Sequence, residues 1–202
     1  MARPEAQARA RTARPAATFS RLRSKLAREV HTALGRVDPA QVHSLADAMI
    51  DARRIFIAGR GRTGFVMQAF AMRLMHLRLK VHVVGETTTP NIARGDLLVA
   101  GSGSGETRFT NLAASIAQEF SAKTACITSR PESALAKMSD IIIVIPAPAF
   151  RADARVKTPS IQPVGSLFEQ TLLLLLDSVV LMLMDRLGIT CETLLRRHAN
   201  VE

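Results

Sequence analysis

Residues 97–107 read "LLVAGSGSGET", an apolar run that leads at once into a loop of glycine and hydroxyl side chains. Short apolar runs bounded by glycine are typical of strands that are buried on both faces of a sheet. Segments of helix length separate most of these runs, and this alternation predicts an α/β fold with a parallel sheet wrapped by helices. Four further runs have the same character: "IFIA" (55–58), "VHVV" (81–84), "TACI" (124–127) and "IIIVI" (141–145).

Helices are expected before, between and after these strands. Residues 20–34 carry leucine and valine at helical spacing, and Asp38 followed by Pro39 marks the start of a second helix. Residues 109–120 carry apolar side chains at positions i, i+3, i+4, i+7, i+8 and i+11. We expect that helix to pack on the sheet by this stripe.

The most apolar stretch begins at Leu167. Glu169, Gln170 and Asp177 interrupt it, so it falls short of the roughly 20 uninterrupted apolar residues that a membrane span requires. We therefore expect a buried helix of a soluble protein. Cys126 and Cys191 lie far apart and show no metal-ligand spacing, which argues against disulfides and zinc and favours a reducing, cytoplasmic setting.

The chain has 202 residues and a formal net charge of +10, which is concentrated at the N-terminus. Residues 1–26 hold seven Arg and Lys residues against Glu5 and so contribute six of these charges. Their composition predicts a disordered basic tail over 1–18, followed by a single domain with N-terminal helices over 19–202. A targeting peptide or a weak polyanion contact stays open for the tail. No specific nucleic-acid binding is expected, because the excess charge belongs mostly to the tail and because the absence of Tyr and Trp leaves no aromatic platform for single strands beyond scattered Phe.

The loop after residues 97–100 is a candidate phosphate site. Its glycines, including Gly103, free the backbone amides, and Ser102, Ser104 and Thr107 add hydroxyl groups at the start of a helix. A flexible turn with a helix cap is the alternative when the loop is taken alone. It is not a P-loop, because no Gly-Lys-Ser/Thr follows.

A second glycine loop, "GRGRTG" at 59–64, matches the pattern G-x-G-x-x-G. The pattern permits a dinucleotide-binding turn, and Glu86 lies roughly where an acid that binds a ribose would be expected. The hydroxyl-rich loop on a neighbouring strand favours a smaller ligand, since a nicotinamide site does not require such a loop. Taken with that loop, the pattern points to a smaller phosphate-bearing ligand without excluding a dinucleotide turn.

Several segments together resemble the 6-phospho-3-hexuloisomerases, a family of SIS-domain sugar isomerases. These are "AFAMRLMHL", "VHVVGETTTP", "GDLLVAGSGSGET", "GSLFEQ" and "RHANVE", and the resemblance runs from about residue 30 to Glu202. It implies a flavodoxin-like three-layer sandwich around a five-stranded parallel sheet. One departure is that Arg60 and Thr63 stand where the family usually has alanine and serine.

The resemblance also implies an activity. Members isomerise D-arabino-hex-3-ulose 6-phosphate to fructose 6-phosphate through an enediol, in the ribulose monophosphate pathway of formaldehyde assimilation. The family uses no metal or organic cofactor, and its members are cytoplasmic homotetramers with a functional link to 3-hexulose-6-phosphate synthase. Two rival functions stay open: a non-catalytic phosphosugar-sensing module, and an isomerase for another sugar phosphate.

The family motifs direct attention to two catalytic candidates. Glu169 in "GSLFEQ" is the expected base for the proton at C2, and His198 in "RHAN" is the expected proton shuttle or ring-opening acid. Without the resemblance, Glu169 would be an acid stabilised by a helix N-terminus, and His198 a surface residue. With the resemblance, we interpret "GRGRTG" as one wall of a sugar-phosphate pocket in which Gly61, Arg62 and Thr63 contact the phosphate or the enediolate, with a solvated loop arginine as the alternative for Arg62. Glu86 and Thr87 are expected to line the sugar, and a structural turn before Pro90 is the open alternative.

Overall fold

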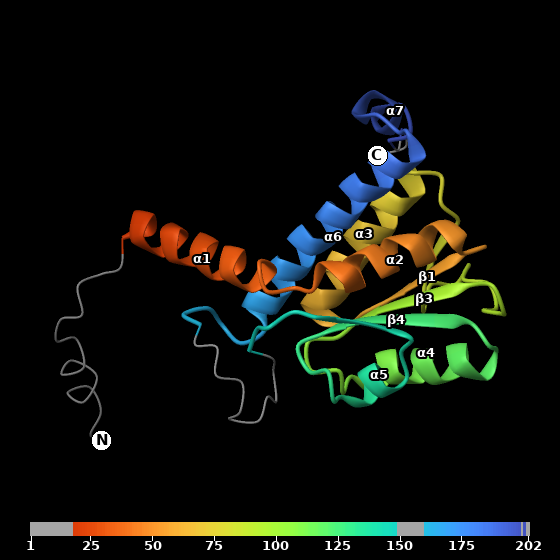
Figure 1. Cartoon of the computed structure of the whole chain (residues 1–202), viewed down its shortest axis with the longest axis horizontal. Helices are drawn as coiled ribbons and strands as arrows, with labels where there is room; N and C mark the ends of the chain where they lie inside the picture. Colours follow the sequence, from red (N-terminus) through yellow and green to blue (C-terminus); the bar gives the residue numbers. More distant parts are fainter. Residues whose placement is uncertain (1–17, 149–159, 199, 201–202) are drawn as a thin grey trace, which may run out of the picture.

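The central sheet of the protein, seen in a computed structural model, has five strands (Figure 1). The structure describes residues 18–148, 160–198 and 200. All neighbouring strands run parallel, in the order β2-β1-β3-β4-β5, and Ile57 pairs with Val83 on one side and Val99 on the other. The predicted parallel sheet is therefore confirmed. The strands are β1 (Ile55–Ala58), β2 (Val81–Val83), β3 (Leu97–Gly101), β4 (Lys123–Thr128) and β5 (Ile141–Val144).

Helices cover both faces of the sheet, which confirms the three-layer sandwich (Figure 1). The thicker layer contributes to the larger apolar core and is continued by the short helix α7 (Cys191–Leu195). Its members are α1 (Phe19–Leu34), α2 (Pro39–Asp51), α3 (Gly61–His76) and α6 (Ser166–Leu187). The opposite layer consists of α4 (Arg108–Glu119) and α5 (Ala134–Lys137).

The starts of the first two helices follow from local sequence. Thr18 accepts a hydrogen bond from the Arg21 N–H at 3.4 Å, and Asp38 accepts one from the Ala40 N–H at 2.9 Å. Pro39 occupies the first helical position, where its missing N–H costs nothing. The predicted start of the second helix is confirmed. The predicted tail over 1–18 lies, apart from Thr18, outside the described residues.

The orientation predicted for α4 is confirmed for Phe109, Ala113 and Ala117, which pack against the core, and is wrong for the rest of the predicted stripe. The buried face of the helix consists of Thr110, Ala114 and Ala117, whereas Leu112 and Phe120 are 61% and 52% exposed. Small side chains let the helix backbone approach the sheet closely, so beyond Phe109 the helix packs by its small residues. Leu112, Ile116 and Phe120 are left on the outer surface of this layer.

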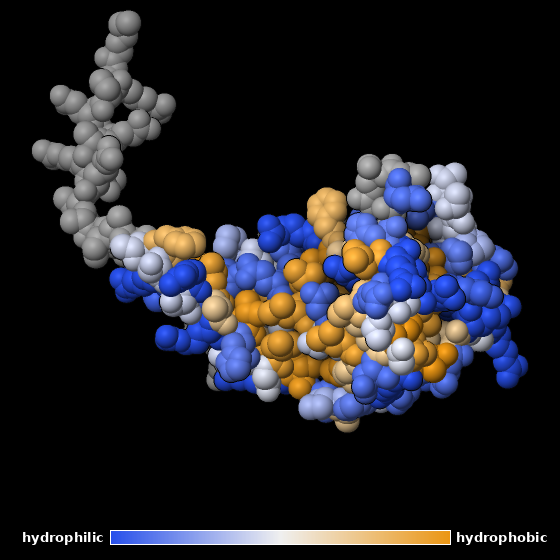
Figure 2. All heavy atoms as spheres, turned by 90° about the horizontal axis from the view of Figure 1, so that it is seen from above, coloured by the Kyte–Doolittle hydropathy of each residue, from blue (hydrophilic) through white to orange (hydrophobic). Residues whose placement is uncertain are grey.

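Helix α6 is 22 residues long and apolar enough, by length and composition, to cross a membrane. However, 56% of its most apolar window is buried within the described structure, where it packs against α1, α2 and α3. The helix behaves as a core element, as predicted. Figure 2 looks down on this layer and shows apolar side chains gathered on its surface. Its exposed apolar side chains include Phe65, Met72, Met75, Leu173, Leu174 and Leu181.

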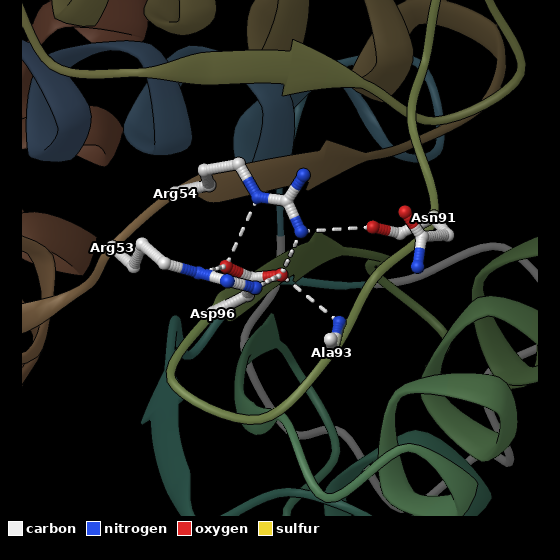
Figure 3. Close-up of polar contacts among 5 residues, drawn as sticks. All are labelled: Arg53, Arg54, Asn91, Ala93 and Asp96. Atoms are coloured by element: carbon white, nitrogen blue, oxygen red, sulfur yellow. Dashed lines mark hydrogen bonds and ion pairs between the residues drawn. The ribbon is translucent and has the colours of Figure 1, made fainter.

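An ion-pair cluster joins the starts of β1 and β3, at the opposite end of the strands from the loops discussed below (Figure 3). Asp96 is 2% exposed and accepts hydrogen bonds from Arg53 Nε at 3.1 Å, Arg54 Nη2 at 2.7 Å and the Ala93 N–H at 2.9 Å. Burial by itself would raise the pKa of Asp96, but these hydrogen bonds outweigh it and lower the pKa to about 2. Arg54 also donates to the Asn91 carbonyl at 2.9 Å.

Candidate active site

A cavity of about 760 Å³ lies at the carboxyl ends of the strands, the expected position for a ligand in a sheet of this kind. Three separate parts of the chain form its walls: the first turn of α3, the loop between β3 and α4, and the start of α6. The lining residues are Thr63, Gly103, Ser104, Glu106, Thr107, Arg108, Val164, Gly165, Phe168 and Glu169.

The β3–α4 loop is held in shape by hydrogen bonds within itself. Ser102 is buried, and its Oγ accepts from the Gly105 N–H at 3.1 Å and lies 3.0 Å from Thr107 Oγ1. Ser104 Oγ accepts from the Glu106 N–H at 3.2 Å. Ser104 and Thr107 line the cavity. Ser102 does not line it, and instead stabilises the loop through its buried hydrogen bonds.

Gly105 is the position in this loop that requires glycine. Its φ is +66°, and an added Cβ would lie 2.0 Å from Ser133 Oγ. Gly103 has a related role, because an added Cβ would lie 3.2 Å from the Phe168 ring of α6. The glycines thus let the loop pack closely against α5 and α6.

The glycines of "GRGRTG" also serve close packing. An added Cβ on Gly59 would lie 3.1 Å from Gly64 Cα, so these two glycines bring the end of β1 against the first turn of α3. Gly61 has a φ of +61° and is exposed. Of the candidates in this segment, Thr63 lines the cavity directly.

Glu169 lies in the first turn of α6, and its side chain is 14% exposed. Arg62 in the first turn of α3 donates from Nε to Glu169 Oε2 at 2.5 Å, and its own side chain is 67% exposed. The chain enters α6 through Gly165, whose φ is +91°. An ion pair between two helix starts therefore sets the direction of the Glu169 carboxylate at the cavity.

Two candidates from the β2–β3 connection belong to none of the three cavity walls. Glu86 and Thr87 are exposed and do not line the cavity. Nearby, the Arg60 guanidinium stacks on the Phe109 ring, with Cζ 3.6 Å from the ring centroid. The residue that departs from the family pattern thus connects the loop after β1 to the first turn of α4.

His198 lies away from Glu169 within one chain. It borders a second, more apolar cavity of about 410 Å³, formed by the later part of α6 and by α7, and its ring centroid is 5.3 Å from that of His76. A helix of 22 residues, such as α6, is about 33 Å long. Since Glu169 belongs to its first turn and the second cavity to its later turns, one chain does not bring the two catalytic candidates together.

Two charged residues of the main cavity were missed from the sequence. Glu106 lines the cavity and accepts from the Ala134 N–H at 3.1 Å, which ties the loop to α5. Arg108 is exposed, lines the same cavity, and is the first residue of α4. The sequence signal that could have identified them is their position within three residues after "GSGSG", at the start of the helix that follows the loop. Within the described ranges, no group of three or more His, Cys, Asp or Glu side chains could hold a metal ion.

The fold and this cavity belong to one class of protein: the SIS domain family matches residues 48–173, which include every residue that lines the cavity. A 3-hexulose-6-phosphate isomerase from Bacillus subtilis is 42% identical over 180 residues, covering 89% of this chain and 96% of that protein. One from Mycobacterium gastri is 44% identical over 174 residues, covering 86% of each chain. The chain belongs to the SIS domain family and, within it, to the 3-hexulose-6-phosphate isomerases.

A solved structure agrees with this assignment. The crystal structure of a protein from Methanococcus jannaschii superposes with a TM-score of 0.77 at 32% identity, and covers 90% of this chain and 99% of that one. Its description infers a molecular function of 3-hexulose-6-phosphate isomerase for that protein.

Proposed function

We propose that this protein interconverts D-arabino-hex-3-ulose 6-phosphate and fructose 6-phosphate by proton transfer through an enediol. The observation that carries the proposal is a single cavity lined by both the hydroxyl-rich loop, with Ser104 and Thr107, and the carboxylate of Glu169. An anion-binding loop and a base on one cavity are what a phosphosugar isomerase needs. The two bacterial relatives named 3-hexulose-6-phosphate isomerase support the same proposal.

In the proposed mechanism the phosphate binds at the β3–α4 loop, with the free amides and hydroxyls of Gly103, Ser104 and Thr107. Glu169 takes the proton from C2 of the 3-ulose, and O3 of the resulting enediolate takes up a proton to give the enediol. The enediol then loses the proton on O2 as Glu169 returns a proton to C3, which leaves the carbonyl at C2. One carboxylate can carry both transfers if it lies on the same side of both carbons. Arg62, 2.5 Å from Glu169, holds the carboxylate in place and supplies positive charge next to the developing enediolate.

We assign the role of proton shuttle or ring-opening acid to His198 of another copy of the chain. One chain keeps His198 and Glu169 apart, whereas a neighbouring copy could bring the two residues to one substrate. The exposed apolar side chains of α3 and α6 favour such an assembly, and we propose a homotetramer. We further propose a cytoplasmic enzyme of formaldehyde assimilation that works with a 3-hexulose-6-phosphate synthase.

The decisive experiment incubates the purified protein with the 3-ulose 6-phosphate in D₂O and follows both fructose 6-phosphate formation and exchange of the C2 proton by NMR. Glu169→Gln should abolish both signals, because the amide keeps the shape of the side chain and cannot accept the proton. Asp185→Asn is the matched control, since Asp185 is an exposed carboxylate near the other end of the same helix. A wild-type protein that binds phosphosugars without turnover would instead be a sensor, and the proposal would fail.

A further inference from the structure

We propose that Arg108 is the principal cationic ligand of the substrate phosphate and sets the preference of the cavity for phosphorylated sugars. The inference rests on the proposed function and adds to it a residue that none of the sequence motifs identifies. Arg108 is the first residue of α4 and lines the main cavity beside Ser104 and Thr107. Arg108 therefore borders the same space as the hydroxyl-rich loop.

The other arginine near the cavity is already engaged. Arg62 is bound to Glu169 at 2.5 Å, so moving it to the phosphate would remove the partner of the proposed base. Among the residues that the structure describes, Arg108 has no ion pair and no side-chain hydrogen bond. An exposed arginine at a cavity that has no protein partner has its guanidinium available to a ligand, and the planar fork of that group matches the oxygens of a phosphate.

The charge balance of the cavity supports the same assignment. Two carboxylates line it, Glu106 and Glu169, and Glu106 is fixed there by its hydrogen bond to the Ala134 N–H. The positive charge of Arg62 compensates the negative charge of Glu169. The remaining negative charge of the lining is that of Glu106, beside the hydroxyl-rich loop. A doubly charged phosphate would be repelled by Glu106 unless a cation lies close to it, and Arg108 is two residues away in sequence and on the same cavity wall.

The position of Arg108 also distinguishes its role from that of the loop. Hydroxyls and amides can bind neutral and charged oxygens alike, whereas a guanidinium favours the charged group strongly. We therefore infer a division of labour in which Ser104 and Thr107 fix the geometry of the phosphate and Arg108 supplies the discrimination against the unphosphorylated sugar.

The test compares Arg108→Gln, Arg108→Lys and the wild-type protein. Arg36→Gln is the control, because Arg36 is exposed in the α1–α2 connection and its removal changes the net charge equally. Arg108→Gln should raise KM for the 3-ulose 6-phosphate roughly 10- to 100-fold, the loss expected for a hydrogen bond to a charged group, while kcat changes less than about threefold. Arg108→Lys should recover a large part of the loss, since it restores the charge but not the fork.

Binding of inorganic phosphate, measured by calorimetry without turnover, separates this proposal from the proposed function. Phosphate should bind the wild-type protein and the Arg36→Gln variant equally and bind Arg108→Gln at least tenfold more weakly. An unchanged phosphate affinity in Arg108→Gln would overturn the assignment even if the enzyme isomerises the sugar. A fall in kcat with an unchanged KM would also overturn it, because Arg108 would then act on the intermediate. A wild-type protein that binds phosphate through Arg108 but does not turn over the sugar would refute only the proposed reaction.

Discussion

Arg62 and Glu169, 107 positions apart in sequence, meet through a hydrogen bond of 2.5 Å from Nε to Oε2. Each belongs to the first turn of a helix, α3 for the arginine and α6 for the glutamate. The pair fixes the carboxylate direction at the cavity and links two of its three walls. The arginine therefore has a positioning role in the proposed chemistry.

Replacing Arg62 by Gln should lower kcat about 10- to 100-fold, because a carboxylate that loses its partner samples many unproductive directions. The affinity for inorganic phosphate should fall much less than in Arg108→Gln, since Arg62 is occupied by Glu169. Steady-state kinetics and calorimetry on the two variants check this contrast. If phosphate binding depends more on Arg62 than on Arg108, the two roles are exchanged.

Replacing Gly105 by Ala should destabilise the protein and loosen the β3–α4 loop. The left-handed φ of +66° alone costs about 1–2 kcal/mol with a side chain, and the clash with Ser133 adds to it. The double variant Gly105→Ala, Ser133→Gly removes the clash with Ser133 and keeps the strain, and Ser133→Gly alone measures the cost of losing the Ser133 cap of α5. After correction for that cost, the double variant should recover only part of the unfolding free energy. Urea denaturation of the three variants measures the two effects, and full recovery would contradict the importance of the backbone conformation.

The Asp96 cluster predicts a pH-dependent contribution to stability. The pKa of Asp96 is lowered to about 2 in the folded protein, below an ordinary value of about 3.9. Ionised Asp96 therefore contributes roughly 2–3 kcal/mol above about pH 4, and this contribution is lost as the pH falls through the folded pKa. The unfolding free energies of wild type and Asp96→Asn should differ by about this amount at pH 7 and converge towards pH 2.

The Asp96 cluster lies at the strand ends opposite the cavity, so the folded fraction of Asp96→Asn should keep the wild-type KM (Figure 3). Thermal unfolding at several pH values, together with kinetics well below the midpoint, checks both statements. A stability difference that is constant from pH 7 to pH 2 would assign the effect to packing.

Mixing two inactive variants tests the proposed assembly. Glu169→Gln and His198→Ala should each lose most of the activity, and mixed oligomers formed by joint refolding should regain part of it. The recovery arises because some sites then combine an intact Glu169 from one copy with an intact His198 from another. Refolding each variant alone is the control, and mixtures that stay inactive would place both residues' functions within one chain or remove His198 from the mechanism.

The sheet could be predicted from sequence because its strands are short apolar runs with glycine or helix-length segments at their ends. The orientation of α4 could be predicted only in part, since periodicity detects an apolar stripe but does not say whether the sheet or the surface receives it. Leu112 and Phe120 are the clearest examples. Ser104 and Thr107 were identified from local sequence, whereas the Arg62–Glu169 pair depends on the packing of α3 against α6 and leaves no local pattern.

The internal hydrogen bonds of the β3–α4 loop, where we propose that the phosphate binds, affect the entropy of binding. Ser102, Ser104 and Glu106 each hold a backbone N–H, and Arg60 stacks on Phe109 to brace the first turn of α4. A loop that is already ordered loses little conformational freedom when the substrate arrives. More of the interaction free energy of the phosphate, a group remote from C2 and C3, is then left to hold the reacting carbons against Glu169.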